Sequence, residues 1–346
     1  MAYKFIILSI SLVSNFLLSQ GTDRYSIRTI AFYNVENLFD TTNDSLYFDD
    51  EMTPEGNYNW TLKRYEKKIN NIASVISKIG QDITKTGPDI VGVCEVENFK
   101  VLKDLVAHSS LNSYGYSIIH FDSPDERGID VAFLYKRALF IPIAFKSHRL
   151  LLFNDSEQRD YTRDQLVVYG LLDGEEFYFL INHWPSRSGG EARSRPYRHA
   201  AARLNRRIID SIVERNIDAK IISMGDLNDN PTDKSIKNKL TMSELENSKS
   251  ITFYNPMEKL YQKGEGSLAY RDQWNLFDQI LFSRNLISEN RNSYTLWKAG
   301  IYHPVFLMTK EGNYKGYPLR TYAGGRYIGG YSDHFPVYAF LIKKVD

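Results

Sequence analysis

One cysteine is all that the 346-residue sequence contains, and this residue, Cys94, lies inside an apolar run. A lone cysteine cannot form an intramolecular disulfide, so the fold has to be stabilised by its hydrophobic core. Net charge is also nearly absent, because 43 basic residues stand against 42 acidic ones. A long-range field of one sign is therefore excluded as the principle of binding, and a polyanion would have to meet a local basic patch.

Long apolar runs are missing except at the start, where residues 5–18 follow Lys4 and precede small and polar residues. This pattern predicts a signal peptide over residues 1–20, too short and wrongly flanked for a comfortable membrane span. A buried N-terminal helix and an uncleaved anchor are the alternatives. Cleavage would remove Lys4 alone among the charged residues and leave 42 basic and 42 acidic ones.

The mature chain, residues 21–346, is expected to be secreted or periplasmic and to have no stable membrane span. Low-complexity segments, internal repeats and blocks of like charge are lacking, so nothing in the sequence marks a domain boundary. We therefore predict a single domain over residues 21–346.

Short β-rich runs alternate with two helical patterns from residue 26 onward. Apolar residues recur at spacings of three and four from Leu62 to Ile79 and stop at Gly80, which predicts an amphipathic helix. A second helix is predicted over residues 195–215. Many strands with few helices indicate an α/β sandwich, in which two sheets pack face to face with helices outside. The predicted strands cover residues 26–33, 89–96, 116–121, 129–135, 165–172, 177–183, 220–224, 276–282 and 337–342.

Polar and titratable residues sit repeatedly at the ends of these predicted strands. Each one alone is weak evidence, because Asp, Asn and Gly are preferred in turns after strands. Their repetition along the chain indicates a common site. The residues are Asn34 and Glu36 in FYNVEN, Glu95 in CEVEN, His183 in NHWPS, Asp226 and Asn228 in GDLNDN, Asp278 in FDQILF, and Asp333 with His334 in YSDHF.

Such residues suit the hydrolysis of a phosphodiester. A hard divalent cation must neutralise charge on the phosphate, and it prefers carboxylate oxygens and water. Glu36, Glu95 and Asp333 can supply these oxygens. Glu95 also follows Cys94 in a strongly apolar strand, where an unpaired carboxylate is costly, so a cation partner is expected there.

The attacking water must also be deprotonated and oriented. Asp226 can take the proton while Asn228, two residues further on, holds the substrate in place, and the preceding glycine lets the backbone turn. His183, His334 and Asn34 can supply hydrogen-bond donors and a proton for the transition state and the leaving oxygen.

The motifs YNVEN, CEVEN, NHWPSR, GDLND, FDQIL and SDHFPV occur in this order along the chain. Together they make the sequence resemble the endonuclease/exonuclease/phosphatase superfamily of DNase I-like and exonuclease III-like enzymes, over roughly residues 26–343. Within it, the stretch NHWPSRSGG and the RPYR that follows look most like the secreted bacterial endonucleases. The resemblance implies a four-layer α/β sandwich of two mixed, mainly antiparallel sheets with helices outside.

The resemblance also implies a role for each matching residue on the metal side of the site. Glu95 would be the principal metal carboxylate, Glu36 would help to hold the metal, and Asp333 would complete its shell. Asn34 would hydrogen-bond the scissile phosphate.

The remaining matches concern proton transfer. His183 matches a histidine that serves in acid–base chemistry in the DNase I-like branch, and Asp226 with Asn228 matches the pair that activates and positions water. Asp278 would orient His334 and fix its tautomer. Gln279 departs from the pattern, because the family often has histidine there, but Asp278 stays in place.

Seven arginines crowd residues 187–207, with only Glu191 opposing them. Those after residue 200 are typical of a solvated helix face. Arg187, Arg195 and Arg198 come earlier and are predicted to bind substrate phosphates, where counterion release would make binding sensitive to salt.

These patterns predict a monomeric, secreted endonuclease that hydrolyses DNA, RNA or both with a divalent cation, preferably Mg²⁺, with Mn²⁺ or Ca²⁺ as alternatives. Two other hypotheses keep the fold: a sphingomyelinase-like lipid phosphodiesterase, expected to expose an apolar hairpin, and an inositol-phosphate phosphatase with a basic pocket. The arginines favour nucleic acid. A non-catalytic binding protein on a degenerated nuclease fold is the third alternative, and the retained acids and histidines argue against it.

Overall fold

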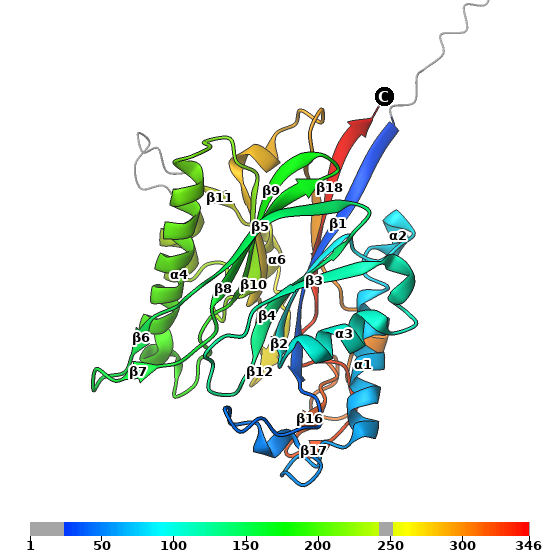
Figure 1. The fold of residues 1–346 in the computed structure, drawn as a ribbon, viewed down its shortest axis with the longest axis vertical. Helices are drawn as coiled ribbons and strands as arrows, with labels where there is room; N and C mark the ends of the chain where they lie inside the picture. Colours follow the sequence, from blue (N-terminus) through cyan, green and yellow to red (C-terminus); the bar gives the residue numbers. More distant parts are fainter. Residues whose placement is uncertain (1–23, 242–251, 346) are drawn as a thin grey trace, which may run out of the picture.

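Two six-stranded sheets pack face to face, and helices cover their outer faces (Figure 1). The computed structural model describes residues 24–241 and 252–345, so the predicted signal peptide at residues 1–20 lies outside the described residues. The predicted α/β sandwich is confirmed. Within the described ranges, no helix is both long enough and apolar enough to cross a membrane.

The first sheet contains β1 (Arg24–Leu38), β2 (Ile90–Val96), β3 (Tyr116–His120), β4 (Asp130–Lys136), β15 (Thr295–Ile301) and β18 (Val337–Val345). Its strand order is β15-β18-β1-β2-β4-β3. Only β1 and β2 pair in parallel, and the other neighbours are antiparallel. The parallel pair lies at the middle of the sheet.

The second sheet contains β5 (Phe140–His148), β8 (Gln165–Leu172), β9 (Glu175–His183), β10 (Ile221–Asp226), β11 (Phe253–Tyr254) and β14 (Asp278–Ser283). Its order is β11-β14-β10-β9-β8-β5, and again the central pair, β9 with β10, is the parallel one. Both sheets are therefore mixed and mainly antiparallel, as the family resemblance implied.

The core lies between the two sheets. A Cβ atom at Gly92 on β2 would lie 3.3 Å from Ile181 on β9 and from Met224 on β10, so the central strands of the two sheets pack closely at this glycine. Beside this point, the rings of Phe133 and Phe179 meet with centroids 5.2 Å apart. Burial of each such side chain stabilises the fold by roughly 1.5–3 kcal/mol.

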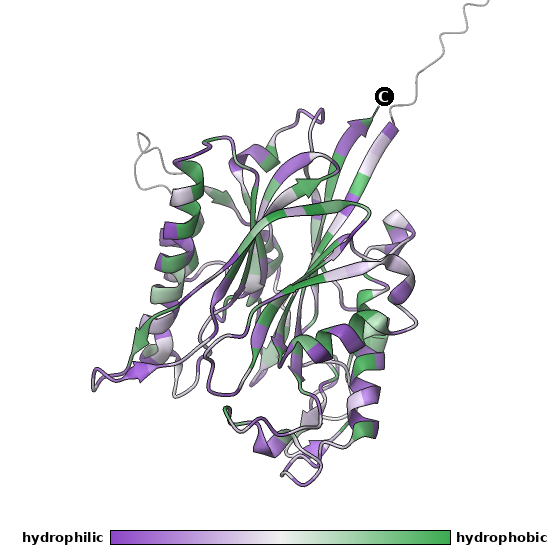
Figure 2. Cartoon of the chain, in the orientation of Figure 1, coloured by the Kyte–Doolittle hydropathy of each residue, from purple (hydrophilic) through white to green (hydrophobic). Residues whose placement is uncertain are grey.

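Three helices form the outer layers. α1 (Leu62–Ile76) and α3 (Phe99–Ala107) lie beside the first sheet, and α4 (Glu191–Val213) lies along the second (Figure 1). Apolar and polar residues alternate along α4 in Figure 2, and Ile208 packs with Leu180 of β9 in a buried cluster. The two predicted helices are thereby confirmed.

The other elements are short. They are α2 (Gln81–Thr84), α5 (Lys234–Ile236), α6 (Met257–Gln262), β6 (Leu152–Phe153), β7 (Arg159–Asp160), β12 (Leu268–Tyr270), β13 (Gln273–Asn275), β16 (Tyr322–Ala323) and β17 (Arg326–Tyr327), with 3₁₀ turns at Asp50–Met52, Asn112–Tyr114, Arg284–Ile287 and Val305–Leu307 and a π turn at Lys237–Thr241.

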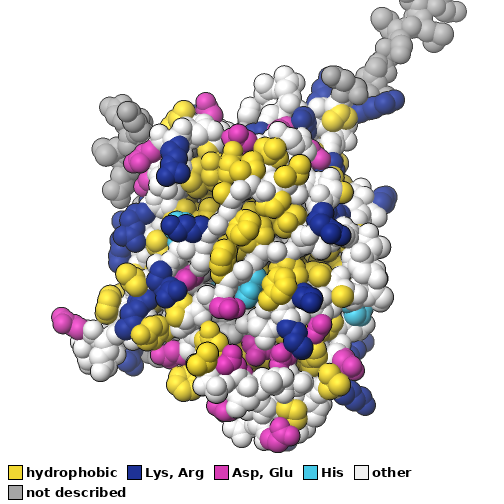
Figure 3. All heavy atoms as spheres, viewed as in Figure 1, with side chains coloured by type: hydrophobic (Ala, Val, Ile, Leu, Met, Phe, Trp, Pro, Cys, Tyr) yellow, Lys and Arg dark blue, Asp and Glu magenta, His cyan; other side chains and the backbone are white. Residues whose placement is uncertain are grey.

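The sequence pattern missed β5, the edge strand of the second sheet. Pro142 interrupts the run, and proline cannot donate to a ladder, so the segment does not resemble a central strand. Ile141, Ile143 and Phe145 are exposed on β5, and hydrophobic side chains form a patch over this region in Figure 3. An edge strand tolerates the proline because one side of it has no partner strand, whereas the exposed side chains belong to a face of the sheet that is open to solvent.

Candidate active site

The ends of the central strands carry unusual backbone. The angle φ is +52° at Glu36, +52° at Asn37, +62° at Glu95 and +51° at Asn228, a left-handed region that residues with side chains rarely adopt. The β1–β2 and β2–β4 ladders also shift register at these ends. Bulges and left-handed residues re-aim side chains and tend to gather at functional sites. The same strand ends carry the residues that the sequence singled out.

Gly225 does not turn the chain, so that part of the sequence interpretation was wrong. It lies within β10, where a Cβ atom would come within 2.3 Å of the carbonyl oxygen of Asn182 on β9. The turn comes later, at Asn228, whose Nδ2 donates to the carbonyl of Trp184 at 3.0 Å. The amide of Trp184 in turn donates to the carbonyl of Asp226 at 2.9 Å. These bonds fix the loops after β9 and β10 against each other.

Asn34 joins the two sheets at this edge. Its Nδ2 donates to Asp226 Oδ2 at 3.0 Å and to Glu95 Oε1 at 3.3 Å. Its Oδ1 accepts from the amide of Glu36 at 3.0 Å, and the amide of Asn37 donates to Glu95 Oε2 at 3.0 Å. The ends of β1, β2 and β10 therefore meet at one place, and β1 ends near the bottom of Figure 1.

Two imidazoles face the same carboxylates. His183 Nε2 lies 3.7 Å from Asp226 Oδ2 and 3.8 Å from Glu95 Oε1. His334 Nε2 lies 3.9 Å from Asp226 Oδ2 and 3.9 Å from Asp333 Oδ1. The structure thus brings together residues that the sequence places up to 300 positions apart.

A buried carboxylate orients the ring of His334 on the side away from Asp226. Its Nδ1 lies 2.6 Å from Oδ2 of the fully buried Asp278, and the hydroxyl of Ser267 donates to the same oxygen. The amide of His334 also donates to the hydroxyl of Ser332 at 3.1 Å. An imidazole whose Nδ1–H donates to a carboxylate presents Nε2 to the site. This is the arrangement that the resemblance implied for Asp278.

Burial and charge set the protonation of the three central groups. Burial raises the pKa of Asp226 to about 7, although the nearby His334 opposes the shift. Burial, with help from the charge of Arg163, lowers the pKa of His183 well below 6.5, so this ring is neutral. Burial also disfavours a charge on His334, but Asp278 and Asp226 outweigh it and hold its pKa well above 6.5. The site therefore combines a weak base, a neutral imidazole and a charged one.

The donors that remain are hard oxygens, which suit a divalent cation. The side chains of Glu95 and Asp333 keep 15% and 29% of their surface exposed, and that of Glu36 keeps 9%. Ligand atoms of another group, Asp226, Asp278 and His334, lie within 4.8 Å of one another. That group fits a cation less well, because His334 and the buried Asp278 already bind each other.

Glu36 is held in place by cations and a backbone amide. The amide of Thr321 donates to its Oε2 at 2.7 Å, and Lys68 Nζ lies 3.5 Å from the same atom. Lys68 is buried on α1, and its ammonium also donates to the hydroxyl of Thr321 at 2.6 Å and to the carbonyl of Tyr331 at 2.7 Å. Burial lowers the pKa of Lys68 and raises that of Glu36. Lys68 thus fastens the loop before Asp333 to the first sheet.

Replacing Lys68 by methionine is expected to lower the free energy of unfolding by about 3 kcal/mol, because Glu36 would lose its buried cation and keep only the half-exposed Arg320, and the Thr321 hydroxyl and Tyr331 carbonyl would lose their donor. Urea unfolding of the purified protein measures this. The exposed neighbour Lys67 offers a matched control, and Lys67→Met should change the value by less than about 0.5 kcal/mol. Equal unfolding midpoints for the two variants would contradict the stabilising role of Lys68 beside Glu36.

The three predicted phosphate-binding arginines differ in exposure. Arg198 is fully buried, and its Nε donates to Asp229 at 2.5 Å, so the prediction that it binds phosphate is not compatible with its place in the structure. Arg195 pairs with Glu191 on the same helix at 2.6 Å. Arg187 is partly exposed and donates to the carbonyl of Asn228 at 2.9 Å. The Nη2 of Arg187 also lies 2.9 Å from Asp233 and 3.3 Å from Asp229, so this arginine is held against the loop that follows Asp226.

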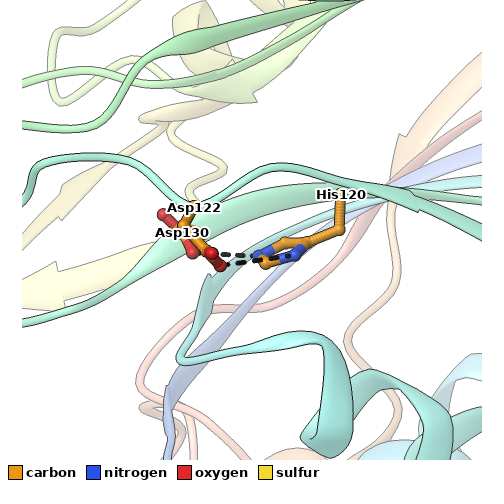
Figure 4. Close-up of side chains that lie close together, drawn as sticks. All are labelled: His120, Asp122 and Asp130. Atoms are coloured by element: carbon orange, nitrogen blue, oxygen red, sulfur yellow. Dashed lines mark hydrogen bonds and ion pairs between the residues drawn. The ribbon is translucent and has the colours of Figure 1, made fainter. Parts of the chain in front are cut away.

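A second histidine cluster supports the rim of the site. His120 Nε2 lies 2.9 Å from Asp130 Oδ2, and its Nδ1 lies 3.9 Å from the exposed Asp122, as Figure 4 shows. The pair joins the end of β3 to the start of β4 and closes the loop that carries Asp125. Arg163 donates to Asp125 at 2.9 Å and to the carbonyl that follows His183 at 2.8 Å. A loop of the first sheet thereby braces the end of β9.

Sequence reasoning missed Lys68 and Arg320, which contact Glu36, and Arg163, which donates to the carbonyl of Trp184 next to His183. Arg320 Nε lies 3.6 Å from Glu36 Oε1, and its Nη2 donates to Asp333 Oδ2. For Lys68 a signal existed. It falls three residues after Tyr65 and four before Ile72, on the apolar face of the predicted helix, where a lysine needs a buried partner.

The chain belongs to the endonuclease/exonuclease/phosphatase family, whose sequence model matches residues 29–343. Members of this family are hydrolases that act on phosphoester bonds and use divalent metals. A search of curated proteins finds no match.

Solved structures show the same fold. D. rerio TDP2 complexed with a single-strand DNA product has a TM-score of 0.54 and 15% identity, over 91% of this chain and 99% of that one. A Bacteroides thetaiotaomicron mannosyl-6-phosphatase has a TM-score of 0.52 and 19% identity, over 91% of this chain and 99% of that one. An endonuclease/exonuclease/phosphatase family protein from the same bacterium has a TM-score of 0.52 and 18% identity, over 94% of this chain and 98% of that one. At such identities the likeness establishes the fold, and the secreted bacterial branch stays a prediction.

Proposed function

We propose that the protein is a secreted, monomeric nuclease that hydrolyses phosphodiester bonds of DNA, RNA or both with the help of a divalent cation, Mg²⁺ by preference. The proposal is supported above all by the groups that surround the carboxylate of Asp226. Asp226 Oδ2 lies 3.0 Å from Asn34 Nδ2, 3.7 Å from His183 Nε2 and 3.9 Å from His334 Nε2. A base, two imidazoles and an amide donor thus face one reacting centre.

Each side chain has a distinct task in this mechanism. Asp226 takes the proton of the attacking water, and Asn228, its amide held by Trp184, orients that water. The charged His334 stabilises negative charge on the phosphoryl group, and the neutral His183 hydrogen-bonds it or the leaving oxygen.

Two further requirements concern the phosphate itself. A cation held by Glu36, Glu95 and Asp333 would supply Lewis-acid stabilisation of the phosphate charge. Asn34 would donate to a phosphate oxygen by giving up the longer of its two Nδ2 hydrogen bonds, the one of 3.3 Å to Glu95, while keeping the one to Asp226. Arg187, partly exposed beside Asn228, is proposed to contact a flanking phosphate, which makes cleavage sensitive to salt.

A substrate panel tests the proposal. Circular DNA, linear DNA, RNA, sphingomyelin vesicles and mannose 6-phosphate are incubated with the protein in Mg²⁺ or in EDTA. We expect metal-dependent cleavage of a nucleic acid, and circular DNA separates internal from terminal cutting. Turnover of the sugar phosphate or the lipid alone would reject nucleic acid as the substrate.

The rate of hydrolysis is expected to rise with pH around a midpoint of about 7. Burial raises the pKa of Asp226 to about this value, and only its deprotonated form can accept the proton of water. The pKa of His334 is held well above 6.5, so the falling limb of the profile lies at higher pH. Measurement of kcat between about pH 5 and pH 9 gives the profile. A rate that is flat below neutrality would show that Asp226 is not the base.

One observation favours the lipid phosphodiesterase as a second candidate. The hairpin of β6 and β7 exposes Leu151, Phe153 and Tyr161 by 61%, 56% and 47%. The strands that flank it, β5 and β8, meet this hairpin at the edge where β9 ends. Phe153→Ser should weaken binding to sphingomyelin vesicles if this candidate is right, and it should leave cleavage of DNA unchanged if the nuclease is right.

A further inference from the structure

Arg320 stands between two carboxylates that the proposed function assigns to the cation. Its Nε lies 3.6 Å from Glu36 Oε1, and its Nη2 donates to Asp333 Oδ2. The side chain is 48% exposed, which sets it apart from the buried Lys68 on the other side of Glu36. Within the described residues, Nη1 of Arg320 makes no contact, so its N–H groups are available to donate to another partner.

A pocket of about 280 Å³ opens beside this guanidinium. Its lining includes Tyr58, Tyr322 and Gly324, the two carboxylates Glu36 and Asp333, and Arg320, which is the one basic residue among the residues that line it. A Cβ atom at Gly324 would meet nothing within 4 Å, so the pocket is open to solvent on that side. Once a divalent cation offsets the charge of Glu36 and Asp333, the pocket can take an anionic group beside Arg320.

The backbone of the loop that carries Arg320 is anchored by buried hydrogen bonds, whereas the Arg320 side chain is half exposed. The amide of Thr321 donates to Glu36 at 2.7 Å, and Lys68 binds both the hydroxyl of Thr321 and the carbonyl of Tyr331. These bonds anchor the backbone on both sides of the pocket. A change of partner at Arg320 therefore needs only a rotamer change of a half-exposed side chain, which costs little.

A guanidinium and a divalent cation compete for the same oxygens. Arg320 neutralises Glu36 and Asp333 in the metal-free protein, whereas a cation on these carboxylates repels it. We propose that Arg320 is a substrate-binding residue that exchanges partners: Glu36 and Asp333 hold it in the absence of metal, and phosphate oxygens of the substrate take it over when a divalent cation occupies those carboxylates. This inference rests on the proposed function, which makes Glu36 and Asp333 cation ligands.

Calorimetric titration with Mg²⁺ alone tests the first half of the exchange. Arg320→Met should bind Mg²⁺ about fivefold more tightly than the wild type, because a half-exposed ion pair worth up to about 1 kcal/mol no longer opposes the cation. Arg320→Lys keeps the charge and should stay within about twofold of the wild type. Arg326→Met, which removes an exposed arginine from β17 outside the pocket lining, is the matched control and should leave the affinity unchanged.

Titration with inorganic phosphate at saturating Mg²⁺ tests the second half. Arg320→Met should weaken phosphate binding by about tenfold or more, since a charge-assisted bidentate contact is lost, and Arg320→Lys should weaken it less. Metal and phosphate affinities that change in opposite directions support the exchange. Weaker Mg²⁺ binding by Arg320→Met would show that the arginine merely supports the carboxylates, and an unchanged phosphate affinity would show that it does not reach the substrate.

Neither titration depends on turnover, so the inference and the proposed function can fail separately. If no phosphodiester is cleaved but both affinities shift as expected, the assignment of a nuclease is wrong and the role of Arg320 stands. If nucleic acid is cleaved and the affinities of Arg320→Met match those of Arg326→Met, the role of Arg320 is wrong and the nuclease stands.

Discussion

Asp226→Asn is expected to lower kcat for nucleic acid cleavage by about 10³-fold while KM stays within about threefold. Asparagine keeps the shape of the side chain and can still accept from the amide of Asn228, so the loop should retain its form. It cannot take a proton from water, and the loss therefore falls on the chemical step. Steady-state kinetics at saturating Mg²⁺ measure both parameters.

Asp218→Asn provides the matched control for this prediction. Asp218 is exposed and precedes β10, at the end of the strand away from the site. The same chemical change there should leave kcat and KM unaltered. A rate for Asp226→Asn within about tenfold of the wild type would show that another group, such as His183, removes the proton.

The same variant should also reveal a conflict between activity and stability. Burial raises the pKa of Asp226 from 3.8 to about 7, so the folded protein binds this proton more tightly than the unfolded chain does. Asp226 makes its full contribution to the free energy of unfolding below about pH 4. This contribution, about 4 kcal/mol, is lost as the pH rises through about 7. Active sites often retain such unfavourable groups because the reaction needs them.

Urea unfolding in EDTA measures the free energy of unfolding of the wild type and of Asp226→Asn at two pH values. At pH 8, Asp226→Asn should be more stable than the wild type by about 2 kcal/mol, because the buried charge is removed, although the hydrogen bond from Asn34 is lost when the asparagine oxygen accepts from Asn228. At pH 5 the wild-type carboxyl is protonated, so the variant should be equal or slightly less stable. A variant that is destabilised equally at both values would contradict the raised pKa.

Much of the fold could be predicted because its central strands are buried on both sides. The run from Ile90 to Cys94 is continuously apolar, and residues 221–224 are apolar except for Ser223, as is typical of short strands buried on both faces. β5 and β15 were missed for the opposite reason. They are edge strands, so their side chains face solvent on one side and their patterns are interrupted, by Pro142 in one and by Lys298 in the other.

The site was predictable where its residues follow central strands, since the carboxyl ends of such strands meet at one edge. Contacts made by loops were not. Lys68 and Tyr331 are 263 positions apart, and no local pattern relates them. Arg198 was misassigned although a signal existed, because it falls three residues before Ala201 on the buried face of α4. Its helical position should have outweighed its membership in a run of arginines.

Glu95→Gln is expected to weaken Mg²⁺ binding by at least about 100-fold and to make cleavage depend on a correspondingly higher Mg²⁺ concentration. Loss of supporting groups around a metal costs about 10–100-fold in affinity, and loss of a charged ligand costs more. Glutamine keeps the size of the side chain, and its single oxygen can accept from either Asn34 or the amide of Asn37, so one of these two hydrogen bonds at the bulge is retained and the other is lost. Calorimetric titration with Mg²⁺ measures the affinity, and EDTA should abolish cleavage by the wild type.

Glu97 supplies a control two residues further along the chain. Burial raises its pKa to about 8, so near neutral pH it is largely protonated and glutamine imitates it closely. Glu97→Gln should bind Mg²⁺ like the wild type and cleave at a similar rate. If Glu95→Gln also bound Mg²⁺ normally, the cation would have to lie elsewhere, with Asp226, Asp278 and His334 as the next group to test. Because that group contains the proposed base and its histidine, water activation would then have to be assigned to other residues.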